Sequence, residues 1–266
     1  MPEGDTIFRV SQSLGRYLIP KSVTKVYIRS IPYAEELLLG RAIEDVTSIG
    51  KNLFIVFEGD LILRAHSTMF GSWHLYSRGV SWRRSARHCV AIVETADVAA
   101  VAFDVPLLQL STGVERTLGT FRAELGSDLI RDDLNLDVAV ARFREHSGDV
   151  SIGEALLDQR IVAGIGNIYR CETLFKAKIS PYRPAASIST DEIAAMLEIA
   201  STDLTYNAKE NANIKRIFES GVDGTFVYGR DGLPCRLCGK LICRRIMGDP
   251  SERVPRPIFY CPHCQV

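Results

Sequence analysis

Hydrophobic residues follow a helical spacing at the start of the chain and then gather in short runs. Over residues 5–18 the apolar side chains recur every three or four positions, which predicts an amphipathic helix. These positions are Ile7, Val10, Leu14 and Leu18. Between about residues 24 and 112 the short β-type runs are KVYIRS, NLFIVF, LILRAHS, HCVAIVET and VAAVAFDV. Because no helical pattern separates these runs, they predict an N-terminal antiparallel β-sandwich or barrel-like sheet behind a leading helix.

The second half of the chain has a helical pattern. Its candidate helices are VAVARFREH, SIGEALLDQR, NIYRCETLFKAK and STDEIAAMLEIA. Ser189 and Glu192 have the spacing of a capping box at the start of the last helix. The apolar face of that helix consists of Ile193, Met196, Leu197 and Ala200. We therefore predict an α+β multidomain protein with a sandwich domain at 1–128, a helical domain at 129–227 and a small Gly-, Pro- and Cys-rich domain at 228–266.

Charge is balanced over the whole chain but not locally. The 266 residues are 46% hydrophobic and 24% charged, and the formal net charge is zero. Segment 228–266 nevertheless holds seven basic residues against three acidic ones. A second basic cluster consists of Arg78, Arg83, Arg84 and Arg87. Two such clusters suit an anionic partner that touches part of the surface, although solvated loops have the same composition.

The chain carries no sign of export or of a membrane span. Residues 2–5 are not basic and no long apolar run follows them, as a secretory signal would require. The longest apolar stretches are too short to cross a bilayer. We expect a soluble cytoplasmic protein with no membrane partner.

Four cysteines at the C-terminal end have the spacing of a metal site. Cys235 and Cys238 form one C-x2-C pair, and Cys261 and Cys264 form another after a gap of 22 residues. Two such pairs supply four thiolates for one zinc ion, and a hairpin between them accommodates the gap. Disulfides are the alternative, which the expected cytosolic location disfavours. Cys243 and His263 lie close in sequence, but the two pairs already complete a closed, structural site.

Two features carry possible chemistry without metal. Gly164 and Gly166 interrupt two helical patterns, and Asn167 occupies the N-cap position of the second helix, where a phosphate binds well. An ordinary helix hairpin with a glycine turn is the alternative. The chain opens MPEGDT, so removal of the methionine leaves Pro2 as a secondary amine at the N-terminus, followed directly by the carboxylate of Glu3.

These signals coincide in one known family. The opening MPEG, the LLDQ…AGIGNIY…E.LF segment and the terminal PC..CG…R…YCP.CQ segment resemble the formamidopyrimidine-DNA glycosylase/endonuclease VIII family of DNA-repair enzymes. The resemblance implies a helix-two-turn-helix DNA-binding domain, a β-hairpin zinc finger with one structural Zn²⁺, and damaged double-stranded DNA as the partner of a monomer. It implies a bacterial enzyme that works on nucleoid DNA as a glycosylase and as an abasic-site (AP) lyase, by β,δ-elimination.

The resemblance also implies roles for three residues near the reaction. Pro2 would attack C1′ of the damaged nucleotide, Glu3 would handle protons, and Lys51 after Gly50 would contact phosphate near the scissile site. An α-amino group has a pKa of about 7.7–8.0 and is therefore closer to neutrality at physiological pH than a lysine. Each residue has a plainer reading: Pro2 permits methionine removal, Glu3 complements a helix dipole, and Lys51 is solvated surface.

Other residues would hold the DNA. By the same resemblance Asn167 and the finger arginine Arg256 bind phosphate, with Arg253 as the competitor for the finger role. An everted nucleotide leaves a hole in the duplex, and RAHSTMFGSW aligns with the wedge loop of the family that fills it. Its candidate fillers are Thr68, Met69 and Phe70. A loop anchor buried in the sheet domain is the alternative for these residues.

Departures from the pattern bear on the substrate. The branch that removes oxidised purines carries Asp-Pro-Arg-Arg-Phe-Gly, whereas this chain reads FDVPLLQLS and keeps only Asp104. A wedge supplied by one loop resembles endonuclease VIII, so we expect oxidised pyrimidines as substrates. The alternatives are oxidised purines, or a zinc-dependent protein that binds damaged DNA without catalysis. Asp5-Thr6 replaces the Pro-Glu of many relatives, and no base-reading residue is assigned within 207–226.

Overall fold

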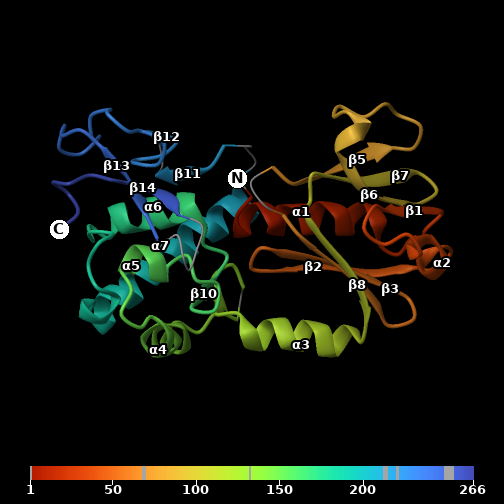
Figure 1. Cartoon of the computed structure of the whole chain (residues 1–266), viewed down its shortest axis with the longest axis horizontal. Coiled ribbons are helices and arrows are strands. Elements are labelled where there is room, and N and C mark those ends of the chain that lie inside the picture. Colours follow the sequence, from red (N-terminus) through yellow and green to blue (C-terminus); the bar gives the residue numbers. More distant parts are fainter. Residues whose placement is uncertain (1, 68–69, 132, 212–214, 220–221, 249–254) are drawn as a thin grey trace. The chain divides into compact units, whose positions relative to one another are not determined.

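A computed structural model describes residues 2–67, 70–131, 133–211, 215–219, 222–248 and 255–266. The chain divides into two compact units, Met1–Ala123 and Glu124–Val266. Each unit is described by itself (Figure 1). In the described part of the chain, no helix combines the length and the apolar character that crossing a membrane requires.

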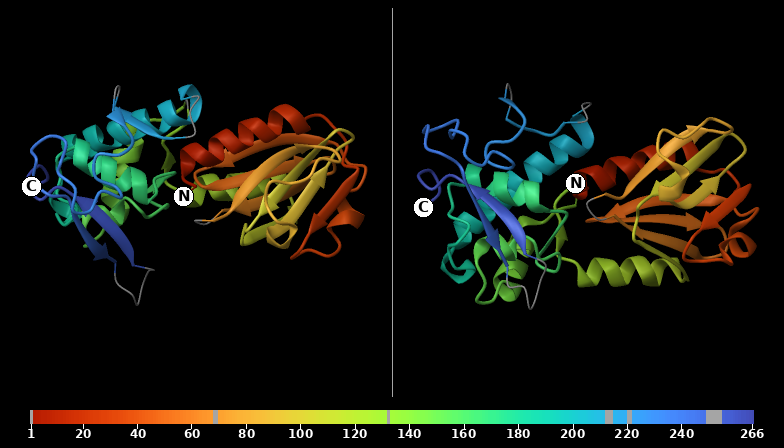
Figure 2. Two further views of the ribbon diagram at one scale, coloured as in Figure 1. Left: turned by 90° about the horizontal axis from the view of Figure 1, so that it is seen from above. Right: turned by 45° about the horizontal axis from the view of Figure 1, so that its top comes forward.

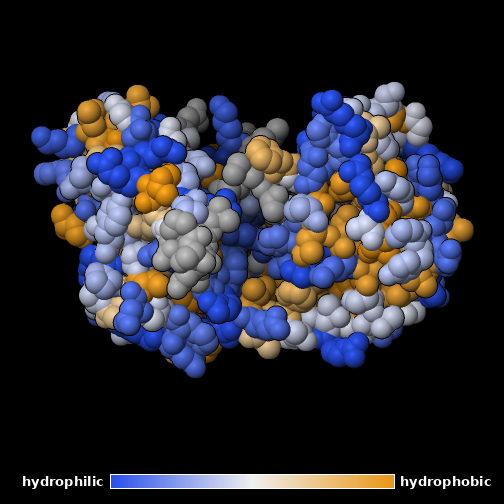
Figure 3. All heavy atoms as spheres, viewed as in Figure 1, coloured by the Kyte–Doolittle hydropathy of each residue, from blue (hydrophilic) through white to orange (hydrophobic). Residues whose placement is uncertain are grey.

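The first unit is a sandwich of two four-stranded antiparallel sheets, as predicted. One sheet has the strand order β1-β6-β7-β5, formed by β1 Lys25–Ile28, β6 Cys89–Glu94, β7 Val98–Phe103 and β5 Ser72–Ser77. The other has the order β2-β3-β4-β8, formed by β2 Ile43–Ile49, β3 Asn52–Phe57, β4 Leu61–His66 and β8 Leu107–Thr112. Figure 3 shows hydrophobic side chains between the two sheets, where the edge of the sandwich faces the viewer.

The predicted leading helix is present as α1, Gly4–Leu18. Ile7, Leu14 and Leu18 lie in the core formed with both sheets, and each is at most 3% exposed. Two helices that the hydrophobic pattern did not reveal are α2, Ala34–Leu38, and α3, Val114–Glu124. Leu118 is the only described residue of α3 that is buried, so this helix has almost no apolar stripe for a pattern to detect.

The outer face of β3 is covered as well as its inner face. All six residues of β3 are buried. Phe54 packs against Phe121 of α3 with ring centroids 5.3 Å apart, and the guanidinium of Arg64 lies 4.3 Å from the Phe121 centroid. A strand buried on both faces reads as a continuous apolar run, which is why NLFIVF was recognisable in the sequence.

The second unit is mainly helical. Its helices are α4 Leu136–His146, α5 Ile152–Ala155, α6 Asn167–Lys176 and α7 Thr190–Thr205. Its paired strands are β9 Ser127–Asp128 with β10 Val162–Ala163, β11 Ile217–Glu219 with β12 Val222–Asp223, and β13 Cys243–Met247 with β14 Arg256–Tyr260. Short 3₁₀ turns occur at Ala86–His88 in the first unit and at Ala185–Ser187 in the second, and a π-helical turn, Tyr206–Glu210, extends α7. Figure 2 shows β13 and β14 as a hairpin.

The helix ends test the capping predictions. The capping box of α7 is confirmed, because the Ser189 side chain accepts from the Glu192 amide and the Glu192 side chain accepts from the Ser189 amide. The predicted helix SIGEALLDQR is wrong in extent, since α5 ends at Ala155. The reason lies in Gln159, which donates to the Leu157 and Ile165 carbonyls and accepts from the Gly164 amide. These bonds stabilise the turn between α5 and α6 in place of a further helical turn.

Candidate active site and nucleic-acid-binding elements

The N-terminal residues enter α1 directly. Pro2 is half-buried, and Glu3 is the N-cap residue, with an extended backbone at φ −128° and ψ −176°. The side chain of Glu3 makes no capping bond to the helix, although its carbonyl accepts from the Thr6 and Ile7 amides at 3.0 and 3.1 Å. Glu3 and Asp5 are both 0% exposed. The structure therefore places two buried carboxylates within three residues of Pro2, whose nitrogen becomes a secondary amine when Met1 is removed.

Lys51 lies in the tight turn between β2 and β3. Gly50 precedes it with φ +56°, in the left-handed region that glycine adopts without strain. Beside this turn, the Oδ1 atom of Asn52 accepts from Arg64 Nε at 3.0 Å and lies 3.2 Å from His66 Nδ1. Burial lowers the pKa of His66, and the positive charges of Arg64 and Lys51 lower it further. Lys51 of the turn and Arg64 of β4 thus place two positive charges near a histidine that the sequence did not single out, although it lies in the quoted RAHST segment.

The three proposed wedge residues are unequally described. Thr68 and Met69 lie outside the described residues. Phe70 is 72% exposed. A side chain this exposed does not anchor its loop in the sheet domain, which removes the buried alternative for Phe70. An exposed phenylalanine on a loop that precedes β5 is available to contact a partner.

In the second unit, Asn167 begins α6, but not as its cap. We predicted that Asn167 is the N-cap residue; this is wrong, because Gly166 caps the helix and Asn167 is its first residue. The amide Nδ2 of Asn167 donates instead to the carbonyl of Pro257 at 2.8 Å. The side chain of Asn167 therefore joins the glycine turn to β14, where Arg256 is half-buried at the first position of the strand. The competitor Arg253 lies outside the described residues.

A buried arginine orients this contact. Arg170 is 0% exposed, and its Nη2 donates to Oδ1 of Asn167 and, at 3.1 Å, to the carbonyl of Pro257. Its Nη1 donates to the carbonyl of Gly153 at 3.2 Å. Arg170 thereby fixes which way the Asn167 amide points and ties α5, α6 and β14 together. Sequence reasoning missed it because an arginine in a helix is usually an exposed residue.

Glu172 is a second residue that the sequence did not assign, although it is the glutamate of the E.LF motif. It is 0% exposed. Its Oε2 accepts from the Phe226 amide at 2.6 Å, and its Oε1 accepts from the Val227 and Tyr228 amides at 3.0 and 2.8 Å. Burial raises the pKa of Glu172, and the three amide bonds oppose that rise. The carboxylate thus connects α6 to the segment that leads into the cysteine-rich end of the chain.

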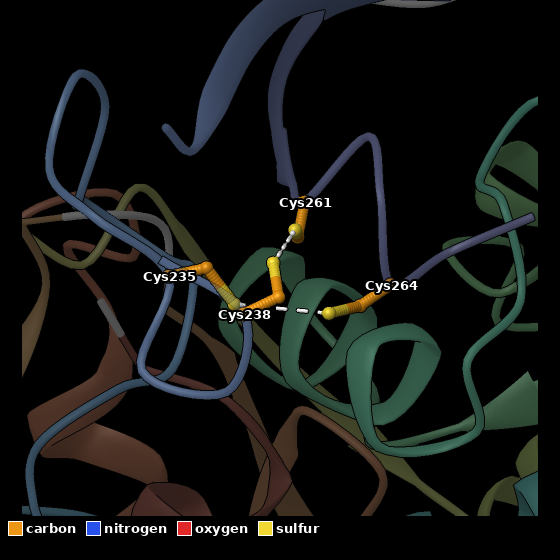
Figure 4. Close-up of side chains that lie close together, drawn as sticks. All are labelled: Cys235, Cys238, Cys261 and Cys264. Carbon is orange, nitrogen blue, oxygen red and sulfur yellow. Dashed lines mark hydrogen bonds between the residues drawn. The ribbon is translucent and has the colours of Figure 1, made fainter. Parts of the chain in front are cut away.

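The four predicted metal ligands come together (Figure 4). The Sγ atoms of Cys235, Cys238, Cys261 and Cys264 all lie within 4.8 Å of one another. Two of the separations are 3.9 Å, from Cys235 to Cys264, and 3.5 Å, from Cys238 to Cys261. Four thiolates at about 2.3 Å from one ion form a tetrahedron with edges of about 3.8 Å, whereas a disulfide requires about 2.05 Å. The cluster therefore fits one metal ion rather than two disulfides, and neither Cys243 nor His263 belongs to it. The hairpin of β13 and β14 accommodates the gap between the pairs, as predicted.

Comparisons with known proteins agree with these elements. The formamidopyrimidine-DNA glycosylase N-terminal domain matches residues 1–106, and the formamidopyrimidine-DNA glycosylase H2TH domain matches residues 125–218. The "Probable endonuclease 8 2" of Streptomyces coelicolor is 34% identical over 100% of this chain and 94% of its own length. The "DNA-(apurinic or apyrimidinic site) lyase Nei2" of Mycolicibacterium smegmatis is 32% identical over 100% of this chain and 99% of its own length.

A solved structure matches the fold. The Lactococcus lactis Fpg protein in complex with abasic-site DNA superposes with a TM-score of 0.81 at 21% identity, over 99% of both chains. This likeness extends through the sandwich, the helices around the glycine turn and the cysteine hairpin. Together with the family matches and the relatives that cover the whole chain, it places the protein: it belongs to the formamidopyrimidine-DNA glycosylase/endonuclease VIII family of bifunctional DNA glycosylases and AP lyases of base excision repair.

Proposed function

We propose that this protein excises oxidised pyrimidines from damaged double-stranded DNA and then cleaves the strand at the abasic site, acting as a monomer. Membership of a family of bifunctional DNA glycosylases and AP lyases supports the reaction class. The observation that carries the chemistry is the fully buried carboxylate of Glu3, adjacent in the chain to Pro2. Because burial keeps this carboxylate away from water, it can serve as a general acid or base for a neighbouring group.

In this reaction Pro2 is the nucleophile. Its unprotonated amine forms a bond to C1′ of the everted nucleotide. The glycosidic bond breaks at the same time, and the base leaves with the electron pair of that bond and takes up a proton. Ring opening then yields an iminium ion, which acidifies the C2′ proton. Loss of that proton expels the 3′ phosphate, and a second elimination expels the 5′ phosphate. Glu3 supplies and accepts the protons of ring opening and elimination.

The remaining predicted residues hold the duplex. Lys51 in the turn and Arg64 on β4 both lie near His66, and two cationic side chains suit a phosphate beside the scissile nucleotide. Arg256 can bind a phosphate through two N–H groups of its guanidinium. The turn at Asn167 can bind another phosphate at the N-terminus of α6. The wedge that fills the vacated base position is the loop of Thr68, Met69 and Phe70, of which Phe70 is largely exposed.

The connection after β7 supports pyrimidine lesions. Asp104 follows β7, and β8 already begins at Leu107, so only residues 104–106 join the two strands. A connection this short leaves no extended second loop to supply an arginine and an aromatic residue to a wedge. The fold alone does not choose between branches, because Lactococcus lactis Fpg, which has the same fold, was solved in complex with an oxidised pyrimidine containing DNA.

A panel of single-lesion duplexes tests the substrate. We expect single-turnover excision of thymine glycol and dihydrouracil to be at least about tenfold faster than excision of 8-oxoguanine, a difference of about 1.4 kcal/mol in transition-state binding. Borohydride added during the reaction should trap a covalent adduct with the pyrimidine substrates. Faster excision of 8-oxoguanine would contradict this proposal and assign the protein to the branch that removes oxidised purines. Binding of every duplex without any trapped adduct would favour the non-catalytic alternative.

For the cysteine cluster we propose one structural Zn²⁺. The four thiolates leave no open position for a reacting water, so the ion serves to fold the hairpin that carries Arg256. Replacing Cys261 with serine should lower the zinc content from about one ion per chain to near zero. It should also weaken binding to an abasic-site duplex by roughly 10–100-fold, the range expected for losing one charge-assisted bond to phosphate.

Zinc content is measured by elemental analysis and affinity by fluorescence anisotropy. Cys243→Ser is the matched control, because Cys243 lies on β13 of the same hairpin but outside the cluster. Full zinc content in the Cys261 variant, or equal losses in both variants, would contradict the assignment.

A further inference from the structure

A network of ionic side chains lies at the base of the loop that carries Phe70. Asp104 holds φ +51°, a left-handed conformation that aspartate tolerates better than most residues. Its Oδ2 accepts from Arg84 Nη2 at 2.6 Å, and its Oδ1 lies 2.9 Å from His88 Nδ1. The bond from His88 holds the pKa of Asp104 below its usual range, so Asp104 is ionised at neutral pH. Arg84 and His88 both come from the segment that includes the second basic cluster.

The same guanidinium reaches the wedge loop itself. Arg84 Nη1 donates to Ser72 Oγ at 2.9 Å and to the carbonyl of Phe70 at 3.4 Å. The guanidinium also lies 5.5 Å from the ring centroid of Phe103, at the end of β7. Arg84 therefore links the end of the wedge loop, the first residue of β5 and the turn after β7. A guanidinium has several N–H donors in fixed directions and can therefore connect three segments at once.

The loop also packs closely on the Asp104 turn. A Cβ atom added at Gly71 would lie 3.2 Å from the Asp104 carbonyl and 3.2 Å from Ser67 Cβ, so glycine permits this approach. The ion pair adds little to stability, because the side chains of Arg84 and Asp104 are 32% and 30% exposed. Its consequence is geometric: it fixes the backbone at Phe70 while the phenylalanine ring stays exposed.

We propose that Arg84, held by Asp104, is a positioning residue that preorganises Phe70 for insertion into the duplex. The proposal rests on the proposed function, in which Phe70 is part of the wedge. The sequence lacks the two arginines that the purine branch carries after the equivalent of Asp104, and the structure brings an arginine to Asp104 from a different segment. A preorganised wedge accelerates the step in which a base is unpaired and everted.

Comparing the rate of base excision with the rate of abasic-site cleavage distinguishes a positioning role of Arg84 from a catalytic one. Excision of a stacked lesion requires eversion against base pairing, whereas an abasic nucleotide has no base to unstack. Arg84→Gln should therefore slow excision of an oxidised pyrimidine from a duplex by about 10–100-fold, the range expected for a small misplacement of a positioned group. Cleavage at a preformed abasic site and excision from a single strand should each change less than about threefold.

Three further variants sharpen the test. Arg16→Gln removes the same charge at an exposed position of α1, outside the second basic cluster, and should leave duplex excision within about twofold of the native rate. Asp104→Asn should reproduce the Arg84→Gln defect, and the double variant should be no slower than either single variant, since both changes break one link. A 2-aminopurine beside the lesion should report slower eversion in Arg84→Gln and Asp104→Asn.

The outcomes are distinguishable. Equal losses of duplex excision and abasic-site cleavage in Arg84→Gln would overturn the positioning role. An unchanged Asp104→Asn beside a slow Arg84→Gln would also overturn it, because Arg84 would then contact DNA directly. If the native protein itself formed no borohydride-trapped adduct with any lesion duplex, the proposed function would fail, and this inference with it.

Discussion

A single additional residue in front of Pro2 is expected to lower the rate of strand cleavage by more than about 10³-fold, while DNA binding persists. Acylation turns the proline nitrogen into a tertiary amide, whose lone pair is delocalised into the carbonyl and cannot attack C1′. The side chains expected to bind phosphate, Lys51, Asn167 and Arg256, stay in place. The measurement is single-turnover cleavage of an abasic-site duplex, with borohydride trapping and anisotropy on the same preparations.

The control restores the native terminus on the same molecule. A protease site placed so that cleavage exposes Pro2 should recover both cleavage and trapping. Pro2→Ala offers a primary amine at the same position and is expected to fall between the blocked and the native proteins. Full activity of the blocked protein would show that another amine is the nucleophile, and peptide mapping of the trapped adduct would identify it.

The second large effect concerns Glu172. Replacing it with alanine is expected to lower the free energy of unfolding by about 3–5 kcal/mol, because three amides that the carboxylate accepts from would lose their partner in a buried site. The Glu172→Gln protein should also be destabilised, because the NH₂ group of the glutamine would face a backbone N–H group, and two donors cannot bond to each other. Urea unfolding monitored by circular dichroism measures both changes.

The matched control for this change is Glu198→Ala, a glutamate on the exposed face of α7. Its unfolding free energy should change by less than about 0.5 kcal/mol. The 226–228 segment leads into the cysteine cluster at which we propose a zinc ion, so Glu172→Ala should also lose that metal faster to a chelator. A Glu172→Ala protein as stable as the control would mean that its three amides find other partners.

Several elements were predictable because their signals are local. The helical spacing of α1, the capping box of α7 and the continuous apolar run of β3 each depend on residues that are neighbours in sequence. Strand β5 was missed because its residues, SWHLYS, include polar side chains, of which His74 and Ser72 bond to each other along the strand. Helix α3 was missed because its contact with the sheet depends on Phe121, which packs on β3 from outside the core.

The chemistry divides in the same way. Roles for Pro2, Glu3 and Lys51 are proposals that rest on the resemblance to the family, whereas the cluster of four cysteines was predictable from the spacing of its two C-x2-C pairs. Glu172 belongs to one of the motifs that carry that resemblance, but only the fold shows that it binds the amides of residues more than fifty positions later. The same holds for Arg170, whose partner Pro257 lies 87 positions away.

The sequence by itself determined the family, the reaction class that the family performs, the four clustered cysteines, most of the helices and five strands of the sandwich. Only the tertiary structure shows how the buried Arg170 orients Asn167, how the buried Glu172 holds its three amides, and that the partly exposed Arg84 bonds to the carbonyl of Phe70. The physical reason is that a motif records which side chains are present at a given spacing. Their orientation depends on hydrogen bonds and ion pairs between segments that come together only when the chain folds.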